Sequence, residues 1–138
     1  MLISTKGRYA LRFMAELAQL GDKEYVPLKD VSQNQNISLK YLEGIAADLK
    51  NAGYISGRHG KGGGYKLALP SDKCTVKQIL TVTEGSLSPV ACLKYSDGCE
   101  RAADCKTLPM WKKLYETIDD FFDGITLSEL TNNSNNKK

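Results

Sequence analysis

The residues with the most distinctive chemistry are three cysteines in one polar, glycine-containing stretch. Cys92, Cys99 and Cys105 are separated by six and by five residues. Thiolates on a loop are suitable ligands for an iron–sulfur cluster or for zinc, and they can also act as redox-active thiols. The spacing lacks the close C-x2-C pairs that are typical of structural zinc sites. The residues by themselves therefore leave four alternatives open, namely a cluster, zinc, redox thiols or unreactive cysteines.

The fourth cysteine and the single histidine have a different setting. Cys74 directly precedes a predicted helix start at Thr75, where we expect it to pack on Ile79 as a hydrophobic staple. His59 lies in a basic, glycine-rich loop, which is a poor place for a buried ligand or a catalytic base. Residues 60–64 also lack the GK[ST] ending of a phosphate-binding loop. Because no nucleophile–base pair is evident, the sequence predicts that the protein is not an enzyme.

The elements that must position these groups begin with a helix and a helix-turn-helix. Apolar residues recur at steps of three and four over 5–20, and Gly21 follows as a stop signal. A short helix is predicted over 28–34, and a second one from the N-cap residue Ser38 to about residue 51. Two short helices joined by a turn of about four residues match a helix-turn-helix.

A β-hairpin is predicted directly after the second helix. Segments 54–58 and 65–69 are predicted strands, and the loop between them, 59–64, is basic and rich in glycine. A basic hairpin tip suits insertion into the narrow, electronegative minor groove of DNA. The predicted fold class is therefore mainly α, with a winged helix-turn-helix domain at its front.

This arrangement predicts a set of DNA-binding residues. Residues near the start of the second helix contact base edges in the major groove. There Lys40 can reach a phosphate or guanine, and Glu43 can accept a hydrogen bond from a cytosine amino group. Gly44 costs the helix about 1 kcal/mol relative to Ala, which a close approach to DNA or to another helix would explain. The alternative for each residue is an ordinary solvated surface. The predicted DNA-binding residues are Ser38, Lys40, Tyr41, Glu43, Arg58, His59, Gly60, Lys61 and Gly62.

The second half of the chain is predicted to end in helices. A capping box at 75–78 opens one helix, and 85–106 is expected to be irregular. A last long helix is predicted from Pro109, and its apolar residues step by three and four as in an a/d seam. A second capping box at 126–129 begins a short final turn, and the tail 132–138 is expected to be disordered. The predicted seam, which would form core or a dimer interface, consists of Trp111, Leu114, Ile118, Phe121 and Ile125.

Charge and composition agree with one soluble domain that faces a polyanion. The 138 residues match the length of one domain. Residues 1–70 hold ten Lys/Arg against six Asp/Glu, whereas 71–138 hold nine against ten, a difference that uneven surface solvation could also produce. No apolar signal region and no stretch near the ~20 apolar residues of a membrane span is present. We therefore expect a cytoplasmic protein without a membrane partner, whose cysteines are thiols or metal ligands.

Three segments together resemble the Rrf-two family of bacterial winged-helix transcription regulators. They are ISTKGRYALR at 3–12, ISLKYLE at 37–43 and GKGGGY at 60–65. The resemblance extends to about residue 131, and the cysteine stretch is similar to the IscR-like branch of iron–sulfur cluster regulators. It implies a homodimer held by the long C-terminal helix and a roughly palindromic double-stranded DNA operator.

The resemblance also implies a division of the chain and roles for single residues. It assigns 1–84 to DNA binding, 85–106 to a cluster or sensor loop, 107–131 to the dimerisation helix with its cap, and 132–138 to a tail. Recognition would pass through Ser38, Lys40 and Glu43, with the wing from Arg58 to Gly62 in the minor groove. At the wing, similar proteins have Arg-Gly where this chain has His59-Gly60.

For the cysteine stretch, the resemblance implies a [2Fe–2S] cluster held by Cys92, Cys99 and Cys105. In that pattern a histidine follows the third cysteine by three residues, but Leu108 stands there and cannot ligate. A related branch has an acidic ligand where Arg8 stands. The fourth ligand would then come from an oxygen donor, the partner subunit or an external molecule. The oxygen donors nearest to the cysteines are Asp97, Glu100 and Asp104. Two alternatives remain, a cluster-free member that senses thiol redox state or cysteine metabolism, and a zinc-stabilised protein-interaction module.

Overall fold

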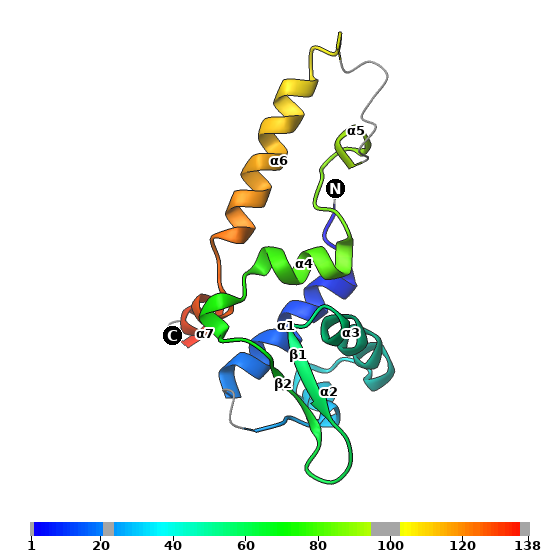
Figure 1. The fold of residues 1–138 in the computed structure, drawn as a ribbon, viewed down its shortest axis with the longest axis vertical. Helices are drawn as coiled ribbons and strands as arrows, with labels where there is room; N and C mark the ends of the chain where they lie inside the picture. Colours follow the sequence, from blue (N-terminus) through cyan, green and yellow to red (C-terminus); the bar gives the residue numbers. More distant parts are fainter. Residues whose placement is uncertain (1, 21–23, 95–102, 136–138) are drawn as a thin grey trace.

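One helix, α6, stands away from a group formed by most of the other helices and a two-stranded hairpin (Figure 1). The computed structural model describes residues 2–20, 24–94 and 103–135. Across those residues, no helix is both long enough and apolar enough to cross a bilayer. The elements in chain order are α1 (Thr5–Leu20), α2 (Leu28–Gln35), α3 (Leu39–Asn51), β1 (Ile55–Arg58), β2 (Gly64–Leu67), the 3-10 turn η1 (Ser71–Lys73), α4 (Val76–Glu84), α5 (Ala91–Lys94), α6 (Leu108–Asp123) and α7 (Leu127–Asn135).

Helix α1 is the centre of the main hydrophobic core. It contacts α2, α3, α4, α7 and β2. Its core-facing residues recur at steps of three and four, so that one stripe of the helix is buried, as the sequence predicted. The fully buried members of this stripe are Ala10, Phe13, Met14 and Leu17.

Helices α2 and α3 form the predicted helix-turn-helix. At the end of α2, Asn36 adopts the left-handed conformation, with φ of 55°. Asn tolerates this region better than most residues, because its short polar side chain can form local hydrogen bonds. Ser38 then caps α3, and its hydroxyl oxygen accepts a hydrogen bond from the backbone N–H of Tyr41 at 3.1 Å. The residues that bury α3 in the core are Leu42, Ile45, Ala46 and Leu49.

The hairpin is antiparallel and is attached to the segment before α2. Ile55 lies opposite Leu67, and Arg58 lies opposite Gly64. Val26 and Tyr65 exchange two backbone hydrogen bonds, at 2.8 and 2.9 Å. The strands are slightly shorter than the predicted 54–58 and 65–69. The base of the hairpin is therefore fixed to the helix-turn-helix, whereas its loop is not.

Helix α4 begins at the predicted capping box and connects the main core to a second, smaller one. The Thr75 hydroxyl accepts from the backbone N–H of Gln78 at 3.2 Å, and the Gln78 side chain accepts from the backbone N–H of Thr75 at 2.8 Å. Cys74 is fully buried in the same core cluster as Ile79, which fits the predicted staple. A second, smaller cluster joins α4 to α6. Its buried members are Val76, Leu80 and Leu87, and Tyr115, Ile118 and Phe122 pack against them.

The predicted seam of the long helix is divided between two faces. Ile118 packs against the small core, whereas Leu114 and Phe121 are 39% and 63% exposed. Ile125 was predicted as the last member of the seam. It lies beyond the end of α6 at Asp123, but it packs on the same small core as Ile118. The helix has two apolar faces, and periodicity along one helix does not specify which neighbour covers each face.

Two expectations for irregular backbone are also wrong. A short helix, α5, lies within the segment 85–106 that was expected to be irregular. The second capping box is present, because Thr126 and Glu129 exchange two backbone-to-side-chain hydrogen bonds of 3.2 Å. The helix that it starts, α7, runs to Asn135, so 132–135 is not the disordered tail that we expected. Once a cap has started a helix, each further residue adds a hydrogen bond at little cost.

Candidate DNA-binding surface and cysteine segment

The outer face of α3 is open to solvent. Lys40, Glu43 and Gly44 are all exposed on it. A Cβ added at Gly44 would meet nothing within 4 Å. Packing against another helix in the described part of the chain therefore does not explain the mid-helix glycine, which leaves close approach to a separate molecule or an ordinary solvated surface.

Two of the predicted contact residues also have local structural roles. The Ser38 oxygen acts as the helix cap, and its O–H remains able to donate to a ligand. Tyr41 is 40% exposed and lies edge-on to Tyr9 of α1, with ring centroids 5.5 Å apart. Such an aromatic pair stabilises a fold by about 0.5–1.5 kcal/mol. Tyr41 therefore lies on the flank of α3 that faces α1.

The base of the wing is held by Tyr25. The Arg58 guanidinium lies 5.7 Å from the centroid of the Tyr25 ring, and the Lys66 ammonium lies 4.7 Å from it. Cations at such distances are attracted to the negative face of the ring. Beyond this base the loop extends away from the protein (Figure 1), and His59 and Lys61 are exposed on it. The wing therefore presents basic side chains from an anchored base.

The glycines of the wing have two different functions. Gly60 and Gly62 have positive φ values of 86° and 77°, and a Cβ at either would meet nothing within 4 Å. They are required for the path of the backbone, because other L-residues rarely adopt such φ values. A Cβ on Gly63 would lie 2.2 Å from the Arg58 carbonyl oxygen, and a Cβ on Gly64 would lie 2.2 Å from that of Val26. These two glycines are required for close packing inside the hairpin.

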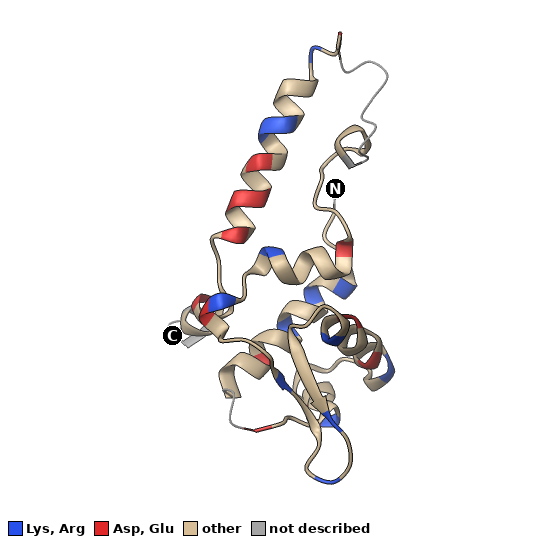
Figure 2. Cartoon of the chain, viewed as in Figure 1, with Lys and Arg blue, Asp and Glu red and all other residues tan. Residues whose placement is uncertain are grey.

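A groove of about 370 Å³ separates the start of α3 from the wing. Lys29, Lys50 and Arg58 line it, with Glu43 as the acid among the described lining residues. Figure 2 shows basic residues over the helix-turn-helix and the wing, and acidic residues along α6. The sequence analysis missed Lys29, Lys50 and Leu39 of this groove. Leu39 lies four residues before Glu43, and Lys50 lies seven residues after it. Both spacings place a residue on the same helix face as Glu43, so helical periodicity could have identified both.

The described residues do not assemble the predicted metal-ligand set. Cys92 is half-buried on α5, and the Sγ of Cys105 lies 3.3 Å from the Thr107 hydroxyl oxygen. Cys99 lies outside the described residues, together with Asp97 and Glu100. Over 2–20, 24–94 and 103–135, no group of three or more His, Cys, Asp or Glu could hold a metal ion. Cysteine thiolates are the usual ligands of iron–sulfur clusters, so these residue types fit such a cluster. Two of the three cysteines lie in the described segments.

The two positions for which the resemblance implied a fourth ligand, Leu108 and Arg8, have other roles in the structure. Leu108 is the first residue of α6 and is 8% exposed, so it belongs to the apolar support of that helix. Arg8 is exposed on α1 and donates to the Thr5 hydroxyl at 3.1 Å. Asp104 is exposed directly before Cys105 and is the described oxygen donor nearest in sequence. Cys74 is fully buried in the main core, and burial raises the pKa of its thiol to about 11.

Polar contacts connect the end of α4 to α3 through the start of α1. Glu84 accepts hydrogen bonds from the backbone N–H and the hydroxyl of Ser4, at 3.1 and 2.5 Å. Burial acts to raise the pKa of Glu84, but the hydrogen bonds from Ser4 and Thr83 and the charge of Lys6 outweigh it and lower that pKa. Lys6 forms an ion pair with Asp48 of α3 at 2.5 Å. The start of α1 thus contacts both the end of α4 and the middle of α3.

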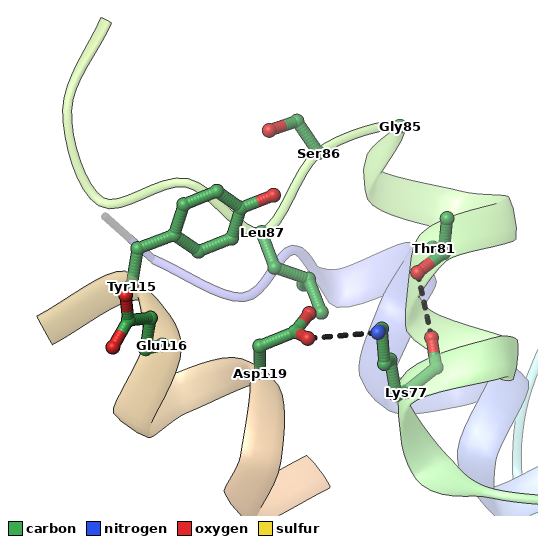
Figure 3. Close-up of a pocket in the computed structure, with 8 residues that line it drawn as sticks. All are labelled: Lys77, Thr81, Gly85, Ser86, Leu87, Tyr115, Glu116 and Asp119. Atoms are coloured by element: carbon green, nitrogen blue, oxygen red, sulfur yellow. Dashed lines mark hydrogen bonds and ion pairs between the residues drawn. The ribbon is translucent and has the colours of Figure 1, made fainter. Parts of the chain in front are cut away.

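A second ion pair joins α4 to α6. The Lys77 ammonium lies 2.8 Å from the Asp119 carboxylate (Figure 3). A pocket of about 390 Å³ adjoins this pair, and Tyr115, Glu116 and the turn at 85–87 also line it. The hydrogen bond to Asp119 is the main cause of a raised Lys77 pKa, which desolvation opposes and the nearby carboxylates reinforce. The pocket therefore lies where the chain leaves α4 for the cysteine segment and where α6 passes it.

Comparison with known proteins identifies the family. A family model described as an iron-dependent transcriptional regulator, Rrf2, matches residues 3–133. The chain belongs to the Rrf2 family. It is 38% identical over 133 residues to the HTH-type transcriptional regulator IscR of Erwinia tasmaniensis, covering 96% of this chain and 80% of that one. A putative HTH-type regulator of Neisseria meningitidis serogroup B is 36% identical over 136 residues, covering 99% and 91%.

Solved structures of Rrf2 relatives have the same fold. The global cysteine regulator CymR of B. subtilis superposes with a TM-score of 0.80 at 35% identity, over 96% of this chain and 97% of that one. IscR of T. potens has a TM-score of 0.76 at 32% identity, over 97% and 88%. The predictions of a mainly helical winged-helix fold, of a DNA-binding transcription regulator and of a protein that is not an enzyme are confirmed.

Proposed function

We propose that this Rrf2 regulator binds a roughly palindromic operator as a homodimer, and that its cysteine segment senses iron–sulfur or redox status. The observation that carries the DNA-binding half is the groove that α3 and the wing share. Lys29, Lys50 and Arg58 line this groove, and His59 and Lys61 extend from the wing beside it. The α3 residues Ser38, Lys40, Tyr41 and Glu43 would contact the major groove, and the wing residues Arg58, His59, Gly60, Lys61 and Gly62 the minor groove.

The exposed apolar face of α6 supports the dimer. Met110, Leu114 and Phe121 are 54%, 39% and 63% exposed, and they lie four and seven residues apart on one side of the helix. A helix face of this kind is stabilised when a second copy covers it. A two-fold dimer would present two recognition helices and two wings, and hence favour an operator with two inverted half-sites.

This arrangement assigns a different function to each of three segments of the chain. Residues 1–84 would bind DNA, 85–106 would act as the sensor, and 107–131 would hold the dimer. Cys92, Cys99 and Cys105 would be the thiol ligands of a [2Fe–2S] cluster, which when bound adds a redox-active, oxygen-sensitive centre to the protein. An oxygen donor among Asp97, Glu100 and Asp104, a residue of the partner subunit or an external molecule would complete the ligation.

Contacts of α4 offer a route from the sensor to DNA. A change in the segment after Gly85 would act on Glu84, which holds Ser4 at the start of α1. Lys6, two residues later, holds Asp48 of α3. Coupling of about 1–3 kcal/mol along such a route would change operator affinity about 5–150-fold.

DNA binding by the anaerobically purified protein tests the first half of the proposal. A duplex selected by this protein from a random library is titrated at several salt concentrations, and we expect a steep loss of affinity with salt. Lys61→Ala should weaken binding, because it removes an exposed positive charge from the wing that would enter the electronegative minor groove. Lys73→Ala, an exposed lysine on η1 away from the groove, is the matched control. Salt-independent binding, or equal losses in both variants, would refute the assignment.

The cluster half is tested by the iron and sulfide content and the visible spectrum of the same preparation. We expect iron, sulfide and visible absorption in the wild type, and their loss in Cys92→Ala. Cys74→Ala is the control, because Cys74 is buried in the core and should leave the metal content unchanged. A preparation without iron and sulfide would remove the cluster from the proposal.

Similarity to the global cysteine regulator CymR favours a second candidate, a cluster-free regulator that senses thiol redox state or cysteine metabolism. Under mild oxidation this candidate predicts a disulfide between two of Cys92, Cys99 and Cys105 that changes operator affinity. Mass spectrometry of the oxidised protein, with operator titrations before and after reduction, separates it from the cluster proposal.

A further inference from the structure

Leu39 is an apolar residue exposed in the basic groove beside the recognition helix. It is the first residue of α3, and 42% of its surface is open to solvent. It lines the groove together with Pro27 and Leu28, and with Glu43 one helical turn further along α3. The groove therefore has an apolar wall at the end where α3 begins, next to a carboxylate that can accept hydrogen bonds.

The residues next to Leu39 make contacts within the protein. The Ser38 oxygen caps the helix, and Tyr41 packs against Tyr9 on the opposite flank. Residues at the start of a recognition helix are those that reach base edges. Leu39 and Glu43 share one face because they are four residues apart, so the two would meet neighbouring base pairs of the same half-site.

We infer that Leu39 is a specificity-determining residue that contacts the 5-methyl group of a thymine in the operator. The methyl group of thymine is the apolar group that base pairs present in the major groove. The lysines and the arginine that line the groove bring phosphates to this surface, so DNA is the occupant that fits its charge. The inference rests on the proposed DNA binding and adds to it the identity of one base.

Removal of single methyl groups from the DNA tests the inference. In the duplex selected by the wild-type protein, each thymine is replaced in turn by deoxyuridine, which keeps all hydrogen-bonding groups. We expect one position per half-site at which the wild type binds about fourfold more weakly, as for the loss of one buried methyl group. Leu39→Ala should bind the thymine duplex more weakly and should not distinguish thymine from deoxyuridine at that position.

Two controls separate the possible causes. Leu20→Ala removes an exposed leucine that does not line the groove, and it should retain the wild-type response to deoxyuridine. Thermal unfolding of Leu39→Ala shows whether the variant is folded, and Leu39→Met, which keeps an apolar side chain, should restore part of the discrimination. No deoxyuridine-sensitive position in the wild type, or the same sensitivity in Leu39→Ala, would overturn the inference while DNA binding stands. Absence of any salt-dependent DNA binding would overturn the proposed function itself.

Discussion

Replacing Gly44 with alanine should stabilise the protein and weaken its binding to DNA. A glycine inside a helix costs about 1 kcal/mol relative to alanine. A Cβ at this position meets no atom of the chain within 4 Å, so no packing cost opposes the gain. For a domain of this size, 1 kcal/mol corresponds to a rise of about 4 °C in Tm. On DNA, the added methyl would hold the exposed face of α3 away from the major groove, and we expect operator affinity to fall about tenfold, or about 1.4 kcal/mol.

Thermal unfolding and fluorescence anisotropy with a labelled operator measure the two effects separately. The contrasting variant is Gly64→Ala, because φ at Gly64 is 141° and a Cβ there would lie 2.2 Å from the Val26 carbonyl oxygen. This second variant should lower Tm, since the backbone of the hairpin would have to shift. A Tm of Gly44→Ala at or below that of the wild type would refute the reasoning about the fold. Unchanged operator affinity would refute the close approach of α3 to DNA.

Two further predictions follow from titratable groups. The folded-state pKa of Glu84 is lowered, so this carboxylate stabilises the fold above its ordinary pKa of 4.5, and the contribution is lost as pH falls through the folded-state pKa. The Tm of Glu84→Gln should therefore fall less steeply than that of the wild type below pH 5. An identical fall in both proteins would contradict this. Because burial raises the pKa of Cys74 to about 11, iodoacetamide at pH 8 should label Cys92 in the folded, cluster-free protein and Cys74 only after unfolding, as judged by mass spectrometry. Early labelling of Cys74 would show that its site opens in the native state.

Local signals in the sequence predicted most of the helices correctly. The N-cap at Ser38 and the capping boxes at 75–78 and 126–129 were identified because each needs only residues three positions apart. The stripe of α1 was identified because one buried face imposes a period of about 3.6 residues. Such features depend on the chain within a few residues, and the rest of the fold hardly alters them.

The faces of α6 and the roles of the glycines were not predictable in the same way. The sequence placed Ile118 and Phe121 in one seam, but one packs on α4 and the other is exposed. It also grouped the glycines of the wing as one glycine-rich loop, whereas Gly60 and Gly64 differ in what a side chain would meet. Both distinctions depend on atoms that are distant in sequence, namely the small core of α4 and the carbonyl of Val26.

The DNA-binding surface and the cysteine segment were recognisable from residue type and spacing. The helix-turn-helix, the basic wing and the three cysteines are local patterns. The first two indicate DNA binding, whereas the cysteines by themselves leave several chemistries open. The tertiary structure decided which of these residues share a surface. It placed Leu39, Lys29 and Lys50 around Glu43 and Arg58, because the pairing of Val26 with Tyr65 holds the wing beside α3. A groove is made by the spacing between elements, and that spacing is set by long-range packing and backbone pairing, which no short window of sequence contains.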